Sequence, residues 1–422
     1  MKAAVPDRSP GSSPRGPPTP HESNGAHLKT FTVIYKALFF LGWGVLSAIL
    51  FLKQASQQAF HAPDGIYFSD LPSHLELLRL SQKGDKSMGH PGFHYAVLLL
   101  AKAFNISLEV SAAIILSAAT MAIALAIYMA LRRSLATTLP DYLLLLFSGS
   151  LMLVSAIYAP FFNKHIYLGQ GSPNAWHNPT LLMVKPLSFA CVMMFASHAE
   201  DGKGPMTIKE ILAIAASLFL SSLIKPNFAL IFIPAMAIYV ALNWRTASLA
   251  WQSLVTILPT ICLLGWQYLA SYKGTAAGDS PNAHIIPDFL GVWQHWSPNI
   301  LASSALVLAF PLSILIFRFR AAQQDFSLKF AWLLTIVGFL QYSLLAESGD
   351  RYLHGNWGWG RLIALQLLFV YSFPHFVRWV GRFRNAGWRE RLQITSVATI
   401  FILHFASGTY YFARIYTGGS YY

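Results

Sequence analysis

The chain has 422 residues, of which 55% are hydrophobic and only 11% are charged, and its mean hydropathy is +0.47. This number of charged residues is too small to cover the surface of a soluble globular protein of this size. The composition therefore indicates a polytopic membrane protein. The formal net charge of +13 raises the possibility of a nucleic-acid partner. The basic residues, however, fall mainly in short clusters between apolar runs, where they act as topology signals, and no nucleic-acid partner is expected.

The N-terminal segment, residues 1–30, is rich in Pro, Ser and Gly and has no apolar pattern. This composition predicts a disordered cytoplasmic tail. Residues 31–52 form the first apolar run long enough to cross a membrane. Because the polar segment before it is longer than the usual start of a signal peptide, we interpret this run as an anchor. The remainder, residues 31–422, is predicted to be a single transmembrane domain.

A long polar loop, residues 53–107, follows the first span, and its first acidic residues are Asp64 and Asp70. Asp70 stands at a predicted helix start, with Pro72 in the first turn, so capping is one interpretation of this carboxylate and catalysis is the other. The helix would lie on the membrane surface, with an apolar stripe formed by Leu71, Leu75 and Leu78. Residues 93–104 are apolar but too short to cross, which predicts a second juxtamembrane helix.

Ten further apolar runs predict an all-α, polytopic transmembrane helical bundle with about eleven spans. They are residues 108–131, 142–162, 181–198, 211–224, 228–242, 254–270, 300–317, 330–346, 362–377 and 392–412. Arg132 and Arg133, and a cluster of arginines between 378 and 391, mark cytoplasmic ends by the positive-inside rule. The predicted location is the cell membrane, with a cytoplasmic N-terminus and an extracytoplasmic C-terminus.

This topology gathers the unusual polar residues on the outer side of the membrane. Two Lys-Pro pairs, at Lys185 and at Lys225, are predicted helix breaks near the outer ends of their spans. Ionisable residues at membrane depth are costly and need a partner or a wet cavity. We therefore consider four residues as candidate phosphate ligands, with snorkelling or interfacial anchoring as the alternative: Lys185, Lys225, Arg351 and Arg361.

Metal binding is weakly indicated. His90 and His94 are four residues apart, but Pro91 follows His90 directly, so His90 is as well explained as a cap and we assign no metal ligand. Asp64 and Asp70 supply hard oxygen atoms that suit a divalent cation. Spacing alone does not decide this point, and the cofactor stays unassigned.

The order of these features resembles the GT-C superfamily of polytopic membrane glycosyltransferases, in an uncharacterised bacterial branch. The resemblance covers roughly the first third of the chain and is carried by Asp64, Asp70, the segment His90 to Tyr95 and the Arg132-Arg133 pair. The late segment GNWGWGR, ending at Arg361, adds to it. The chain departs from the family in having no adjacent acid pair in its first outer loop and no large periplasmic domain, which leaves the acceptor and metal dependence open.

The resemblance implies transfer of a sugar, with inversion, from a polyprenyl-phosphate-linked donor to an acceptor on the extracytoplasmic face. The family's loop acid maps onto Asp70, with Asp64 as the second candidate. Membrane lipid and the lipid-linked donor are the expected partners. The phosphate would contact Lys225, Arg351 and Arg361, and the remaining candidate substrate-binding residues are His74, Asn178, Glu347, His354 and Asn356.

Two other functions remain open. A polyprenyl-linked polysaccharide polymerase or ligase would favour arginines in a late outer loop, where Arg351 and Arg361 lie. A lipid or solute transporter would favour internal repeats and helices broken near the membrane midplane. The glycosyltransferase hypothesis requires carboxylates and cations to converge in one water-accessible pocket that opens sideways to lipid.

Overall fold

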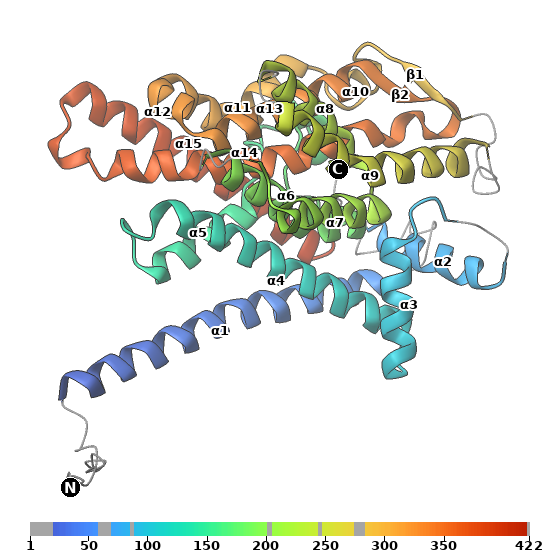
Figure 1. Cartoon of the computed structure of the whole chain (residues 1–422), viewed down its shortest axis with the longest axis horizontal. Helices are drawn as coiled ribbons and strands as arrows, with labels where there is room; N and C mark the ends of the chain where they lie inside the picture. The colour runs from blue at the N-terminus through green and yellow to red at the C-terminus, as the bar shows by residue number, and fades with distance from the viewer. Residues whose placement is uncertain are drawn as a thin grey trace, which may run out of the picture.

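The computed structural model describes residues 20–57, 69–84, 88–200, 205–243, 247–273 and 283–419, with side chains from Thr32 in the first helix and from Ala250 in the helix that begins at Ala247. Most helices run along the long axis of the molecule (Figure 1). The predicted all-α, polytopic class is confirmed, because eight of the described helices are long and apolar enough to cross a membrane. They are α1 (Pro20–Ala55), α4 (Leu108–Leu135), α6 (Pro179–Glu200), α9 (Ala247–Lys273), α11 (Ile300–Phe317), α13 (Phe326–Leu344), α14 (Trp359–Val380) and α15 (Trp388–Tyr416).

The predicted count of about eleven spans exceeds this number because three apolar runs form shorter helices. These are α5 (Asp141–Leu153), α7 (Ile208–Ile224) and α8 (Asn227–Leu242), with 13, 17 and 16 residues. A straight crossing needs about 20 residues. The break between α7 and α8 was predicted and is present, since Lys225 is extended before Pro226, as a residue preceding proline prefers. The break predicted at Lys185 and Pro186 is wrong, because α6 continues through both residues.

The first helix begins at Pro20, inside the segment predicted to be a disordered tail, and residues 1–19 lie outside the described part of the chain. The two predicted juxtamembrane helices are present as α2 (Leu71–Gln82) and α3 (Gly92–Phe104). The predicted apolar stripe of α2 is buried. Both helices lie at the end of the molecule opposite the start of α1 (Figure 1).

Short elements complete the fold. Strands β1 (Ile285–Pro287) and β2 (Leu345–Glu347) pair antiparallel, with Ile286 opposite Ala346. Two short helices, α10 (Gly291–Trp296) and α12 (Phe319–Gln324), flank α11 at opposite ends of the molecule (Figure 1). Short helical segments cover Ile166–Gln170, Gly349–His354, Asn356–Gly358 and Phe383–Asn385.

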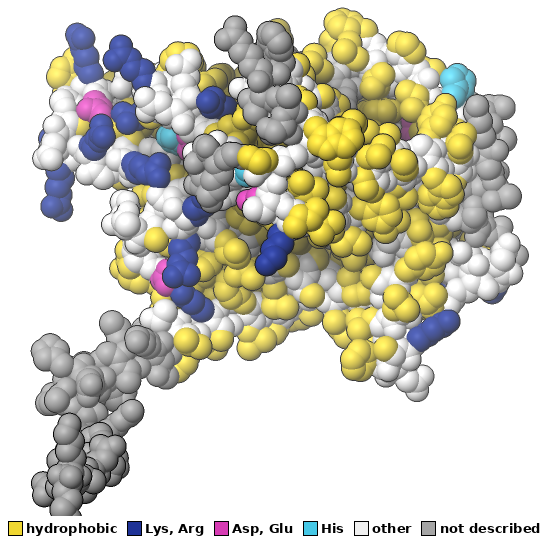
Figure 2. Space-filling model, in the orientation of Figure 1, with side chains coloured by type: hydrophobic (Ala, Val, Ile, Leu, Met, Phe, Trp, Pro, Cys, Tyr) yellow, Lys and Arg dark blue, Asp and Glu magenta, His cyan; other side chains and the backbone are white. Residues whose placement is uncertain are grey.

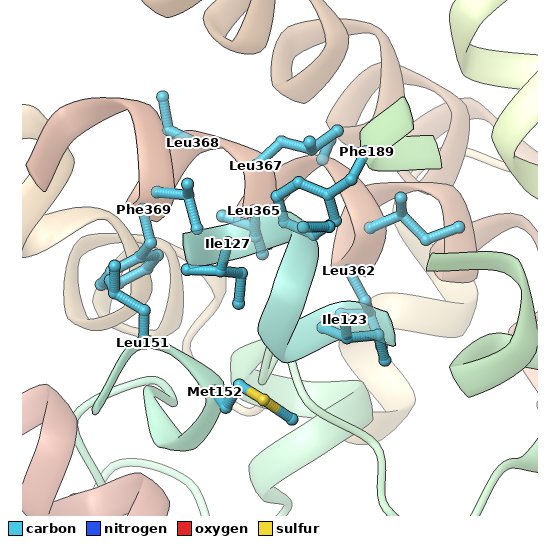
Figure 3. Close-up of a cluster of buried hydrophobic side chains, with 14 of the residues drawn as sticks. Ile123, Ile127, Leu151, Met152, Phe189, Leu362, Leu365, Leu367, Leu368 and Phe369 are labelled. Carbon is cyan, nitrogen blue, oxygen red and sulfur yellow. The ribbon is translucent and has the colours of Figure 1, made fainter. Parts of the chain in front are cut away.

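The core is organised around α14, which is buried along almost its whole length. Figure 3 shows its Leu362 and Leu365 side chains among residues of neighbouring helices, including Ile123 of α4, Met152 of α5 and Phe189 of α6. The outer helices instead expose apolar side chains, and Figure 2 shows a broad hydrophobic surface over the middle of the face in view. An apolar surface of this extent is what a lipid-facing bundle requires.

Between α5 and α6, the chain crosses the interior with the turn Ile166–Gln170 as its one helical segment. Its backbone polar groups are paired with other helices: the Ser155 N–H donates to the His404 carbonyl oxygen at 3.2 Å, and the Tyr158 N–H donates to the Ser407 hydroxyl at 3.0 Å. Irregular backbone is tolerated at membrane depth only with such partners. Gly408 makes the approach possible, because a Cβ atom there would overlap the Leu153 carbonyl oxygen.

Candidate functional site

The Asp70 carboxylate is not used to cap α2. Instead the Ser69 hydroxyl accepts a hydrogen bond from the Leu71 N–H at 3.1 Å and donates to the His177 carbonyl oxygen at 2.8 Å. The Asp70 N–H donates to the same carbonyl at 3.0 Å. The backbone is thus fixed on both sides of Asp70 while its carboxylate makes no capping hydrogen bond. The capping interpretation of Asp70 is therefore wrong, and its side chain is available for other contacts.

Asn178 holds the Asp70 carboxylate. Its Oδ1 accepts from the Leu181 N–H at 2.9 Å and from the Thr180 hydroxyl at 3.0 Å, at the start of α6. This arrangement leaves the Asn178 Nδ2 to donate to the Asp70 Oδ2 at 2.6 Å. The helix start therefore orients the amide, and the amide positions the carboxylate.

Lys225 connects this pair to the rest of the site. Its Nζ donates to the Thr180 hydroxyl at 3.3 Å and lies 4.5 Å from the centre of the Trp359 ring. Burial lowers the pKa of Lys225 to about 8, while the charges of Asp70 and Glu347 act in the opposite direction. One cation thus lies between two carboxylates, one from the first outer loop and one from β2.

A cavity of about 270 Å³ opens beside Lys225. It lies where the junction of α7 and α8 meets α9 and the segment from β2 to Trp357. Part of its wall is apolar, with Leu230 and Leu264, and part is charged. Its lining residues are His90, Lys225, Pro226, Asn227, Leu230, Leu264, Gln267, Tyr268, Ser271, Tyr272, Ile285, Glu347, Arg351, Asn356 and Trp357.

Glu347 is buried at this cavity and is held by three side chains. It accepts hydrogen bonds from the Tyr272 hydroxyl and from the Asn356 Nδ2, and the Arg351 Nη1 lies 3.9 Å from its Oε1. Arg351 also lies 5.8 Å from the centre of the Tyr272 ring. The cavity therefore presents Lys225 and Arg351 together, with a fixed carboxylate beside them.

Burial raises the pKa of Asp70 above its ordinary value. The hydrogen bond from Asn178 and the charges of Lys225 and His354 partly oppose this shift. A carboxylate with a raised pKa binds a proton more readily than a solvated one, which suits a general base. His354 is exposed on the turn that follows β2.

His90 lines the cavity, and two further histidines, His74 and His94, lie on α2 and α3. Burial lowers the pKa of His90 and His94 to about 4 and lowers that of His74 as well. The His74 Nδ1 and the His94 Nε2 share a hydrogen bond of 3.2 Å. This hydrogen bond therefore links α2, which carries His74, to α3, which carries His94. No group of three His, Cys, Asp or Glu residues lies together in the described part of the chain, and Asp64 is outside that part.

Gly92 allows the start of α3 to approach the end of α7 closely. A Cβ atom on Gly92 would lie 2.8 Å from the Leu223 carbonyl carbon and 2.9 Å from the Ile224 backbone nitrogen. Only glycine allows this approach without a shift of backbone. It places the start of α3, with His90, against the end of α7 that carries Lys225.

Two of the predicted phosphate ligands lie away from the cavity. Lys185 is fully buried, and its Nζ donates to the Pro173 carbonyl oxygen at 2.8 Å and to the Asn174 Oδ1 at 3.0 Å. The buried Arg361 donates to the Leu168 carbonyl oxygen at 3.1 Å, and its guanidinium lies 4.3 Å from the centre of the Tyr342 ring. Both cations hold the segment between α5 and α6 in place.

Several residues of the site were not predicted. The Asn-Pro-Thr sequence at the start of α6 is a helix-start signal that could have revealed Thr180. His177 acts through its backbone carbonyl, and Ser69 acts through its hydroxyl as a local helix cap. The residues around them in the sequence give little indication of either role. Tyr272 lies near the end of a long apolar helix, and no sequence pattern distinguishes it from an interfacial tyrosine.

No protein-family model matches the chain, and no curated protein matches its sequence. Among solved structures, the chain is similar to the crystal structure of ArnT from Cupriavidus metallidurans bound to undecaprenyl phosphate. The two share 13% sequence identity with a TM-score of 0.46, over 92% of this chain and 78% of that chain.

Proposed function

We propose that this protein is a membrane glycosyltransferase that moves a sugar from a polyprenyl-phosphate-linked donor to an acceptor on the extracytoplasmic face, with inversion. One observation carries the proposal: Asp70, Asn178, Thr180 and Lys225 form a continuous chain of contacts that ends at the cavity. Through these contacts the buried Asp70 carboxylate, whose pKa is raised by burial, is linked to Lys225, which lines the cavity. Sugar transfer from a phosphate needs both groups.

In the proposed step, the acceptor hydroxyl oxygen bonds to the anomeric carbon while the bond from that carbon to the phosphate oxygen breaks. Asp70 takes the hydroxyl proton, and the electron pair of the broken bond leaves with the polyprenyl phosphate. Lys225 and Arg351 stabilise the negative charge that develops on the phosphate. Atoms and charges balance without any further reactant.

The walls of the cavity fit a donor with a polar head and a hydrocarbon tail. Lys225 and Arg351 face the cavity from two elements, and Leu230 and Leu264 contribute apolar surface to it. On the outside, α9 exposes large apolar side chains along its length, including Leu254, Leu258 and Leu269. A lipid tail lying along α9 would remain in the bilayer while its phosphate reached Lys225.

The sugar would contact polar groups around this phosphate position. Asn356 and Glu347 line the cavity, and His354 lies on the connecting turn. Asn178 has both amide atoms engaged, so its proposed role is to position Asp70. His74, paired with His94, supports the α2 start at which Asp70 lies. Lys185 and Arg361 are assigned to the fold rather than to the phosphate.

The distribution of basic residues supports the proposed orientation. Figure 2 shows Lys and Arg side chains gathered at one end of the molecule, and α2, β1 and β2 lie at the other end in Figure 1. By the positive-inside rule the basic end would face the cytoplasm. The first helix starts at that end and α15 runs away from it, which supports the proposed cytoplasmic N-terminus and extracytoplasmic C-terminus.

The test uses purified protein in proteoliposomes with a panel of polyprenyl-phosphate sugars. We expect the protein to consume at least one donor and to release polyprenyl phosphate. A transporter would instead load labelled solute without any lipid-linked sugar. A polymerase or ligase would join preassembled chains on a lipid diphosphate, so it would ignore monosaccharide donors. Release of polyprenyl phosphate from none of the donors would contradict the proposal.

A further inference from the structure

A second cavity, of about 510 Å³, lies at the basic end of the molecule and has no part in the proposed transfer reaction. It is enclosed by the ends of α4, α6 and α14, by α12 and by the start of α13. Its lining residues are Ala130, Arg133, Ser134, Met193, Glu200, Arg318, Ala321, Gln324, Asp325, Ser327, Tyr371, His375, Arg378 and Arg382. Its size is within the range of sites for small molecules.

The two cavities are separated by nearly the thickness of a bilayer. The α6 helix begins next to Asp70, at Asn178 and Pro179, and ends at Glu200, which lines the second cavity. Its 22 residues extend about 33 Å, at 1.5 Å per residue. The second cavity is therefore a distinct site, at the opposite end of a helix that is long enough to span a bilayer.

The acidic residues of this cavity are already satisfied by its own walls. Glu200 accepts from the Arg133 Nη2 at 2.9 Å and from the Ser327 hydroxyl at 2.7 Å. The Asp325 Oδ2 lies 2.9 Å from the His375 Nε2, and its Oδ1 accepts from the Leu328 N–H at 2.9 Å. The walls of the cavity therefore hold both carboxylates in place.

Three further arginines add positive charge that these acids do not balance. Arg378 donates to the Ser134 carbonyl oxygen at 2.6 Å and acts electrostatically on Asp325, so four arginines line the cavity with two carboxylates. Arg318 lies 5.7 Å from the centre of the Trp379 ring, and its buried Nε has no hydrogen-bond partner among the described residues. Arg382 is exposed at the rim. The cavity therefore carries a net positive charge, with donor groups left open.

A buried hydroxyl adds a second, independent observation. Tyr371 is 7% exposed, and within the part of the chain that the structure describes its hydroxyl has no hydrogen-bond partner. A buried hydroxyl without a partner costs free energy unless a ligand or water satisfies it. Tyr371 and Arg318 both line this cavity, and a hydrogen-bond acceptor would satisfy the Tyr371 hydroxyl and the Arg318 Nε–H together.

We propose that this cavity binds a phosphate group, held by Arg318, Arg382 and the Tyr371 hydroxyl. Guanidinium groups match phosphate oxygens in charge and geometry, and donors from separate elements can reach different oxygens of one phosphate. The phosphate belongs either to a lipid headgroup at the basic end or to a soluble phosphate ester. This inference does not depend on the proposed transferase activity.

Binding can be measured with the full-length protein in maltoside micelles, which carry no phosphate. Inorganic phosphate and short-chain phosphatidic acid are titrated separately, and thermal unfolding reports the affinity. We expect one or both probes to bind, and the Arg318→Gln, Arg382→Gln double variant to lose about tenfold or more in affinity. Binding of inorganic phosphate would point to a soluble ester, and binding of phosphatidic acid alone to a lipid headgroup.

Arg320→Gln is the matched control, because Arg320 carries the same charge two residues after Arg318, inside α12, but does not line the cavity. Tyr371→Phe removes only the hydroxyl and serves if the double variant fails to fold, with a loss of severalfold expected. Titration of Lys225→Gln separates the two cavities, since binding at the basic end should persist in it. The inference is overturned if neither probe binds, if Arg320→Gln loses as much affinity as the double variant, or if Lys225→Gln alone abolishes binding.

Discussion

Replacing Asn178 with Ser tests whether this amide positions the base. Asn178 performs two tasks with two atoms: its Oδ1 caps α6 through the Leu181 N–H, at 2.9 Å, and its Nδ2 donates to the Asp70 Oδ2, at 2.6 Å. Serine is a good N-cap but is too short to reach Asp70. The substitution therefore removes the contact with the carboxylate and keeps the helix start.

The expected loss follows from the strength of a hydrogen bond to a charged group, about 1.5–3 kcal/mol. If that amount is lost from the transition state, kcat falls roughly 10- to 150-fold, at about 1.4 kcal/mol per factor of ten. The free energy of unfolding should change by less than about 1 kcal/mol, because the cap is retained. Asn178→Ala removes both contacts and should lower activity and stability together.

The pH profile provides a second readout. The hydrogen bond from Asn178 lowers the pKa of Asp70, opposing the effect of burial. Without that bond the Asp70 pKa rises, so the base becomes protonated at a higher pH. The acid limb of the rate profile should then move toward neutral pH in Asn178→Ser. Initial rates of polyprenyl phosphate release across a pH series measure both effects. A wild-type rate with an unmoved acid limb would refute the positioning role.

Three further predictions concern the cations and the packing. Lys225→Gln should weaken polyprenyl phosphate binding roughly 10- to 100-fold. The affinity of the wild-type protein should also fall as the pH rises past the Lys225 pKa of about 8. An equal loss of affinity in Lys164→Gln, at an exposed lysine, would contradict a specific contact. Lys185→Met should lower the free energy of unfolding by about 1–3 kcal/mol and leave the affinity for polyprenyl phosphate unchanged. A lower affinity without a loss of stability would contradict the structural role of Lys185. Gly408→Ala should lower the free energy of unfolding by about 1–3 kcal/mol, as measured by thermal unfolding. Gly42→Ala should leave it unchanged, because a Cβ atom at Gly42 would have open space around it. Equal effects of the two substitutions would contradict the close approach at Gly408.

The sequence was sufficient to predict the helical class and the main apolar runs because hydropathy directly reflects the lipid environment. It was less reliable for helices that end inside the protein. The α5 helix stops at Leu153 although apolar residues continue, because tertiary partners such as His404 satisfy the extended backbone that follows. No local pattern reveals such partners, since they lie far away in the sequence.

The candidate site was only partly predictable from the sequence, because the direction of its side chains depends on tertiary packing. Asp70 and Lys225 were proposed from an acid in the first outer loop and a cation at a helix break, and in the structure their charges act on one another. Lys185 and Arg361 had equally suggestive neighbours, but their side chains turn toward backbone carbonyls in the interior. The direction of a side chain at a helix end depends on packing, and the sequence alone does not specify it.

The most direct test of the account is sugar transfer by Asp70→Asn. Asparagine has nearly the same shape as aspartate but cannot take the acceptor proton. We expect this variant to bind polyprenyl phosphate with wild-type affinity and to lose transfer from the lipid-linked donor by at least about 100-fold. Transfer at the wild-type rate would contradict the assignment of Asp70 as the base, and with it the proposed mechanism.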